Sequence, residues 1–195
     1  MKSYRDLSAR TKRLTVLALL TAIVDVLQLV GSFIRFGPFS ISLVLVPIVI
    51  GAAICGPAAG AWLGFVFGLV VLLSGDAGAF MTVNAFGTVL TVLVKGAAAG
   101  FLAGLVYSLL EKKNRYLAVI AAAIVCPVVN TGIFLLGCLV FFMPTITAWG
   151  EAFGYTDVGK YMILGLVGAN FLFELGANIV LSPIILRLIN IRKKS

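Results

Sequence analysis

Three ionisable side chains lie within long apolar stretches of this sequence: Asp25, Lys95 and Glu174. A charged side chain in the hydrocarbon of a bilayer is costly unless it faces a cavity or a partner, so each is a candidate functional residue. Lys95 could hold an anionic ligand through charge-assisted hydrogen bonds, or it could form a buried ion pair with Glu174. Asp25 could likewise pair with Lys95, or face water near the outer end of its helix.

Asparagines accompany these charges at helical spacing. Asn170, Glu174 and Asn178 recur at every fourth residue, which places them on one face of a helix. Asn130 adds a polar position about halfway across the preceding apolar segment. Counted at ~1.5 Å per residue, Lys95 and the Asn170 end of that face both fall in the outer half of a bilayer. We therefore expect these helices to converge on one outward-facing pocket; the alternative is that the amides join helices by hydrogen bonds.

The composition is that of a membrane protein. Of the 195 residues, 62% are hydrophobic and 11% are charged, whereas a soluble domain carries about a quarter charged residues. A helix needs about 20 apolar residues to cross a bilayer, and fewer where Gly and Pro let it sit short or kinked. We expect an all-α membrane protein, a compact bundle of six transmembrane helices forming a single domain over residues 1–195. The expected spans are 14–34, 41–55, 58–73, 85–110, 116–142 and 161–189. The second and third could instead form a re-entrant pair.

The basic residues orient this bundle. With the N-terminus inside, twelve of the 15 Lys and Arg residues fall on the inner side, mainly in the N-terminus (1–13), the turn at 111–115 and the tail (190–195). The positive-inside rule then places both termini in the cytoplasm. The net charge of +8 is thus a topology signal. We expect no nucleic-acid partner, because these residues flank apolar spans and do not form one folded face.

The expected outer connections, 35–40, 74–84 and 143–160, are long and mixed in polarity. Long ordered loops are often lids or binding elements, so we add Arg35 and Asn84 to the candidate substrate-binding residues. Solvated connectors without a ligand role are the alternative. Glycine at every fourth position in 60–68 and 96–104 predicts close packing between helices of this chain.

Several chemistries are excluded by what the sequence lacks. It contains no His, and its three Cys are isolated, which excludes His-based triads and the usual zinc sites. Neither a GxxxxGK[ST] phosphate-binding loop nor a GxSxG turn occurs. We expect no enzyme activity, no metal and no cofactor. The energy for any transport must come from an ion gradient or from a partner.

A short motif in the first helix resembles a family signature. Ala18-Leu19-Leu20-Thr21-Ala22, after the basic run 10–13, is similar to the alanine-x-x-x-alanine motif of the substrate-binding S components of energy-coupling factor (ECF) vitamin transporters. The length, the six spans and the stretches 47–52, 56–60, 95–100 and 107–110 resemble that family over nearly the whole chain.

The resemblance implies a function, partners and a location. S components capture a vitamin from outside with their outer loops and outer helix halves. The Ala18/Ala22 face would dock on a transmembrane coupling subunit that works with two cytoplasmic ATPase subunits, in the plasma membrane of a bacterium.

The identity of the vitamin stays open at this point, because no motif marks it. Lys95 with Arg35 would suit an acidic vitamin such as pantothenate or a folate, and Asn130, Asn170 and Asn178 would suit hydroxyl and amide groups. A stand-alone ion-coupled secondary transporter, with Asp25 or Glu174 as its proton site, is the alternative. Such carriers often show two related halves, and this sequence shows no convincing repeat.

Overall fold

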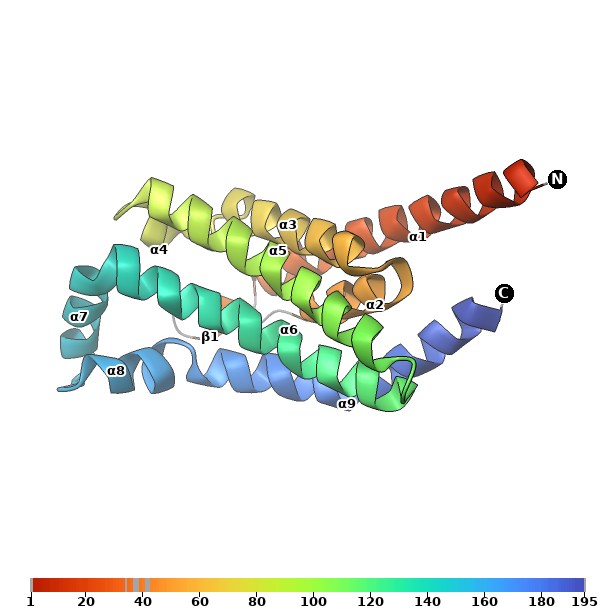
Figure 1. Cartoon of the computed structure of the whole chain (residues 1–195). Helices are drawn as coiled ribbons and strands as arrows, with labels where there is room; N and C mark the ends of the chain where they lie inside the picture. The colour runs from red at the N-terminus through yellow and green to blue at the C-terminus, as the bar shows by residue number, and fades with distance from the viewer. Residues whose placement is uncertain (1, 34, 37–38, 41–42, 195) are drawn as a thin grey trace.

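A computed structural model describes residues 2–33, 35–36, 39–40 and 43–194, with the side chains of residues 10–33 and 43–191. It is an elongated bundle of helices with one short antiparallel hairpin, β1 (Arg35–Phe36) and β2 (Phe39–Ser40) (Figure 1). The longer helices are α1 (Lys2–Gly31), α2 (Leu45–Cys55), α3 (Pro57–Leu73), α5 (Ala85–Leu110), α6 (Arg115–Gly137), α7 (Met143–Ala152) and α9 (Gly168–Lys194). The shorter pieces are α4 (Gly78–Met81), α8 (Val158–Lys160) and the π-helical η1 (Cys138–Phe142) and η2 (Tyr161–Leu166).

Four helical runs of the described chain are long and apolar enough to cross a membrane, namely 10–31, 85–110, 115–152 and 168–191. The other two apolar helices are shorter: α2 has 11 residues and α3 has 17. The four long apolar helices confirm the prediction of a helical membrane protein. The number of full crossings, six, stays a prediction.

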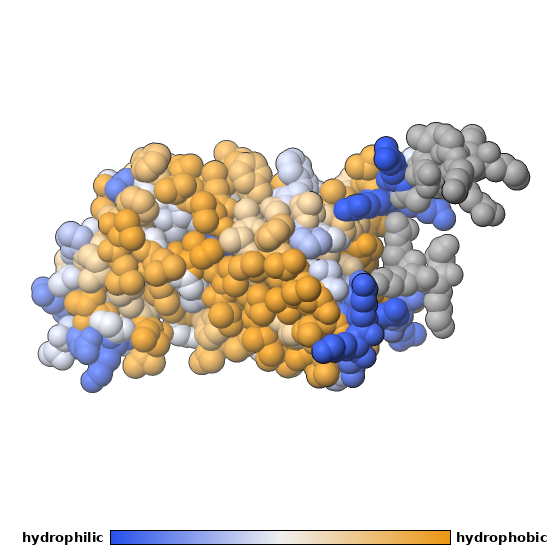
Figure 2. Space-filling model, viewed as in Figure 1, coloured by the Kyte–Doolittle hydropathy of each residue, from blue (hydrophilic) through white to orange (hydrophobic). Residues whose placement is uncertain are grey.

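The surface of the bundle is divided along its length. Both termini lie at one end (Figure 1), and hydrophilic side chains gather at the two ends of the visible face, with a broad apolar band between them (Figure 2). Large apolar side chains such as Leu136, Val140 and Val180 are exposed. An apolar surface of this extent needs lipid to cover it. The placement of both termini in the cytoplasm stays a prediction.

The short helix α2 lies at the centre of the bundle, where it packs against α1, α3, α5, α6 and α9. Eight of its residues are buried, which leaves little of it to face lipid. At its C-terminus the Arg13 guanidinium of α1 donates a hydrogen bond to the Cys55 carbonyl. That contact satisfies a carbonyl that the helix itself leaves unpaired. Gly56 then turns the chain with a φ of 88°, and Pro57 begins α3.

The two predicted glycine faces pack directly on each other. A Cβ atom added to Gly64 would come closer than 3.0 Å to the Gly96 carbonyl oxygen, and one added to Gly60 would come equally close to the Gly100 carbonyl oxygen. The reverse contacts, from Gly96 to Gly64 and from Gly100 to Gly60, are just as tight. The prediction of close packing within the chain is therefore confirmed: α3 and α5 touch backbone to backbone.

The expected third outer loop, 143–160, is largely helical, which corrects its description as a connector. The π-helical η1 ends at Phe142, whose φ of −131° marks the boundary with α7, and Pro144 lies in the first turn of α7. Gly154, with a φ of 80°, follows the end of α7, and the Asp157 side chain caps α8 by accepting a hydrogen bond from the Lys160 amide. These local signals build a helical cap at the end of the bundle opposite the termini (Figure 1).

We expect Gly64→Ala to lower the free energy of unfolding by about 1–3 kcal/mol, because the added methyl group would push α3 away from α5. Gly132→Ala is the matched control: nothing lies within 4 Å of a Cβ added there, and alanine favours a helix over glycine. Thermal unfolding in the same detergent measures both. Equal melting temperatures for the two variants would contradict the backbone contact.

Candidate functional site

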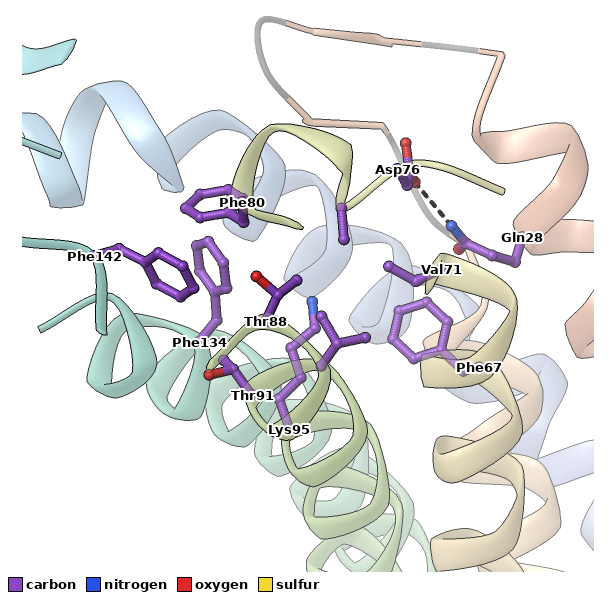
Figure 3. A pocket seen from close by; sticks show the side chains of 12 residues that line it. Gln28, Phe67, Val71, Asp76, Phe80, Thr88, Thr91, Lys95, Phe134 and Phe142 are labelled. Carbon is purple, nitrogen blue, oxygen red and sulfur yellow. Dashed lines mark hydrogen bonds between the residues drawn. The ribbon is translucent and has the colours of Figure 1, made fainter. Parts of the chain in front are cut away.

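An aromatic cavity lies beside α4, at the end of the bundle opposite the termini (Figure 3). It encloses about 570 Å³ of space free of protein atoms, part of which is open to the outside. Most of its wall is apolar, formed by the rings of Phe67, Phe80, Phe134 and Phe142 with neighbouring aliphatic side chains.

Lys95 is the basic residue of this cavity. Its ammonium nitrogen lies 5.7 Å from the centre of the Phe67 ring and 5.3 Å from the centre of the Phe134 ring, so it stands between α3 and α6. Figure 3 shows the lysine rising from α5 toward Thr88, with Thr91 beside it. Ring faces attract a cation, and they hold this ammonium in place without neutralising it.

The side of the cavity toward α4 is an aromatic cluster around Phe80. The ring of Phe80 packs edge to face against Phe134, Phe142 and Trp149, with centroids 5.5, 5.1 and 5.4 Å apart. These partners come from α6, η1 and α7. The connection 74–84, predicted as an outer binding loop, thus contributes a packed side chain to the cavity wall.

A second, polar cavity adjoins the first and shares Lys95 and Phe134 with it. It holds about 300 Å³ of space free of protein atoms, part of which is open to the outside, and it is also lined by Asn130, Thr131 and Asn170. The structure therefore brings together three of the predicted residues, from α5, α6 and α9, as the depth argument expected. Their role in binding stays a prediction.

The predicted polar face of α9 also exists. The Asn170 amide nitrogen donates to Glu174 Oε1 at 3.2 Å, and the Asn178 amide nitrogen donates to the Glu174 backbone carbonyl at 2.9 Å. Glu174 is 2% exposed and lies near Lys95 and Asn130. Its Oε2 atom has no hydrogen-bond partner among the described residues, so the Lys95–Glu174 attraction acts without a direct bond to that oxygen.

The other candidates lie elsewhere. Asn84 caps α5, because its side-chain oxygen accepts a hydrogen bond from the Gly87 amide at 2.9 Å. Asp25 is half-buried in α1 and is not part of either cavity wall. The Arg35 side chain lies outside the described residues. Ala18 and Ala22 are exposed on one face of α1.

Sequence reasoning missed the aromatic wall and the contribution of α1. The wall phenylalanines are four among 14 in the chain, and nothing in their spacing separates them from lipid-facing rings. Gln28 of α1 also lines the cavity, and its amide nitrogen donates to Asp76 Oδ2 at 2.9 Å. Gln28 is a polar residue in an otherwise apolar helix, and this was the signal available in the sequence. Its side chain is 1% exposed.

Apolar helices long enough to cross a membrane, with intramembrane polar groups gathered at two adjoining cavities, are typical of membrane proteins that bind small molecules. Residues 12–186 match the family model described as ECF transporter, substrate-specific component. The chain therefore belongs to this family of transporter subunits. No curated protein and no solved structure matches the chain.

We expect Phe80→Ala to open the cavity beside α4 and to lower the free energy of unfolding by about 3 kcal/mol or more. Because Trp149 would lose its edge-to-face neighbour and meet water, its fluorescence should shift to longer wavelength. The measurement uses a Trp62→Phe background, so that Trp149 is the tryptophan observed. Phe86→Ala is the control, since that ring is 73% exposed. Unchanged Trp149 emission in Phe80→Ala would contradict the described cluster.

Proposed function

We propose that this protein captures an acidic vitamin, or a related small acid, on the outer side of the bacterial plasma membrane. In this proposal the substrate occupies the aromatic cavity and its acid group meets the Lys95 ammonium. A transmembrane coupling subunit and two cytoplasmic ATPase subunits then drive its transport. The membership of the family of ECF substrate-specific components supports the transport role.

The proposal of an acidic substrate rests on the surroundings of Lys95. Its aromatic partners are the uncharged rings of Phe67 and Phe134. Two carboxylates lie in its electrostatic neighbourhood, and each accepts a hydrogen bond from an amide: Glu174 from Asn170, and Asp76 from Gln28. A lysine in a membrane-spanning helix needs an anion to offset the cost of its charge. A carboxylate or phosphate entering the cavity would supply that anion through charge-assisted hydrogen bonds.

Pantothenate and folate remain the vitamins that we propose first, because each joins a carboxylate to several polar groups. The aromatic wall adds a preference for a substrate with an apolar or ring-shaped part. Aromatic pairs contribute roughly 0.5–1.5 kcal/mol beyond the burial of their area, so the pterin ring of folate would benefit most from this wall.

The proposed docking face lies on α1. Ala18 and Ala22 are both exposed and stand one turn apart, which would let the backbone of another helix approach closely. The outward side of α1 is otherwise apolar, with Leu14 and Val26 exposed in line with the two alanines. This arrangement supports a contact with another transmembrane helix.

Lys95→Met tests the acidic substrate. The purified protein is incubated with a mixture of acidic vitamins (pantothenate, folate, biotin, lipoate, nicotinate) and non-acidic vitamins (thiamine, riboflavin, pyridoxine), and the retained molecule is identified by mass spectrometry. We expect an acidic vitamin. Its affinity, measured by isothermal titration, should fall by about 2 kcal/mol in Lys95→Met, the scale of a hydrogen bond to a charged group.

Lys160→Met is the matched control, because it removes the same charge from an exposed position at the same end of the bundle. Its affinity should equal that of the unmodified protein. We also expect Lys95→Met to unfold at nearly the same temperature, since no direct bond to Glu174 Oε2 is lost. Retention of a non-acidic vitamin, or unchanged affinity in Lys95→Met, would overturn the acidic-substrate proposal.

Ala18→Trp together with Ala22→Trp tests the docking face. In cells that supply the coupling and ATPase subunits, this double variant should lose uptake while the purified protein keeps its substrate affinity. Ile184→Trp with Leu188→Trp is the control, since these residues are exposed at the same spacing on α9. Uptake that survives the α1 double variant would remove the docking assignment. Concentrative uptake by the protein alone in vesicles with an ion gradient would favour a secondary transporter.

A further inference from the structure

The polar cavity is lined by oxygen atoms that need hydrogen-bond donors. We propose that the substrate carries N–H or O–H donors in addition to its acid group, and that Asn130 and Asn170 bind these donors, with Glu174 positioning Asn170, while Lys95 binds the acid. This inference rests on the proposed function, because it assigns the two cavities to two parts of one substrate.

Three acceptor atoms carry the argument. Among the described residues, Asn130 Oδ1, Asn170 Oδ1 and Glu174 Oε2 have no hydrogen-bond partner. Asn130 is 4% exposed and Glu174 is 2% exposed, so bulk water does not reach these side chains freely. A buried acceptor without a donor costs about 1–3 kcal/mol, and more when it is charged. An occupant that donates hydrogen bonds would remove that cost.

The bonding pattern fixes which atoms face the occupant. The Asn170 amide nitrogen is used on Glu174 Oε1, so its oxygen is the atom left over. Glu174 likewise uses Oε1 on Asn170 and keeps Oε2. Glu174 does not itself line the cavity, so the site presents the amide oxygens of Asn130 on α6 and Asn170 on α9. The Thr131 hydroxyl and the Lys95 ammonium are the donors of the same cavity wall.

Lys95 joins the two cavities, and this determines how the parts of the substrate are connected. The lysine lines both of them together with Phe134. If the acid group of the substrate binds Lys95, one part of the substrate can extend into the aromatic cavity. Another part can extend into the polar cavity, against the asparagine amides. The substrate class is thus an acid with an apolar or aromatic portion and a separate amide, amine or hydroxyl portion.

The vitamin mixture described above separates donor-bearing acids from donor-free ones. Pantothenate, folate and biotin carry N–H or O–H donors besides the carboxylate, whereas lipoate and nicotinate carry none at neutral pH. We expect a donor-bearing acid to be retained. Its affinity should fall roughly tenfold or more in Glu174→Gln, because the new amide can turn its NH2 group toward Asn170 and displace the hydrogen bond that leaves Asn170 Oδ1 facing the cavity. Asn170→Leu should lose affinity to a similar degree.

Asn190→Leu is the matched control, because Asn190 lies on the same helix at the opposite end and bonds Arg115. Thermal unfolding verifies that each variant is folded, and the conservative shape of Glu174→Gln keeps the test open if a leucine variant fails to fold. Each titration is repeated with choline chloride in place of sodium chloride. A donor-bearing acid should bind equally in both salts.

The possible failures are distinguishable. Retention of lipoate or nicotinate, or full affinity in both Glu174→Gln and Asn170→Leu while Lys95→Met is impaired, would overturn donor recognition and leave the proposed function standing. Binding that requires sodium would assign the acceptors to a cation and overturn the inference as well. Retention of riboflavin or pyridoxine with weakened binding in Glu174→Gln would support donor recognition and overturn the acidic substrate. If no vitamin is retained, both proposals fail.

Discussion

The contact between Gly64 and Gly96 determines where the charged group of the cavity lies. Each glycine would place a Cβ atom closer than 3.0 Å to the carbonyl oxygen of the other, so no larger residue fits without moving α3 and α5 apart. Lys95 directly precedes Gly96, and a Cβ on Gly96 would also lie 3.4 Å from the ring of Phe67. The same close approach that packs the two helices therefore brings the lysine beside an aromatic face on α3.

The cavity region contains charges of both signs within an apolar protein. Lys95 lies between two aromatic rings, and the Glu174 carboxylate accepts a hydrogen bond from the Asn170 amide. These contacts partly offset the cost of burying each charge. Glu174 Oε2 has no hydrogen-bond partner among the described residues. A site built in this way gains more from a ligand with complementary groups than from a purely apolar one.

Helix α1 connects the cavity with the surface proposed for docking. Its exposed Ala18 and Ala22 lie on the outside of the bundle, and Gln28 farther along the same helix forms part of the cavity wall and bonds Asp76. Toward the terminal end, Arg13 of this helix bonds the carbonyl of Cys55 in α2. One continuous helix thus contacts the cavity wall, the central helix and, in the proposed function, the coupling subunit.

The sequence by itself determined the helical membrane fold, the family and the polar positions within the apolar helices, because each depends on local quantities. Apolar length identifies helices that can cross a bilayer, spacing of four places Asn170, Glu174 and Asn178 on one face, and an intramembrane lysine is rare enough to stand out. Only the tertiary structure decided which phenylalanines form the cavity, that Asn84 is a helix cap, that α2 is central and that 143–160 folds into helices. The reason is physical: a phenylalanine that faces lipid and one that faces a cavity have the same local sequence preferences, and they differ only in which distant helix packs against them.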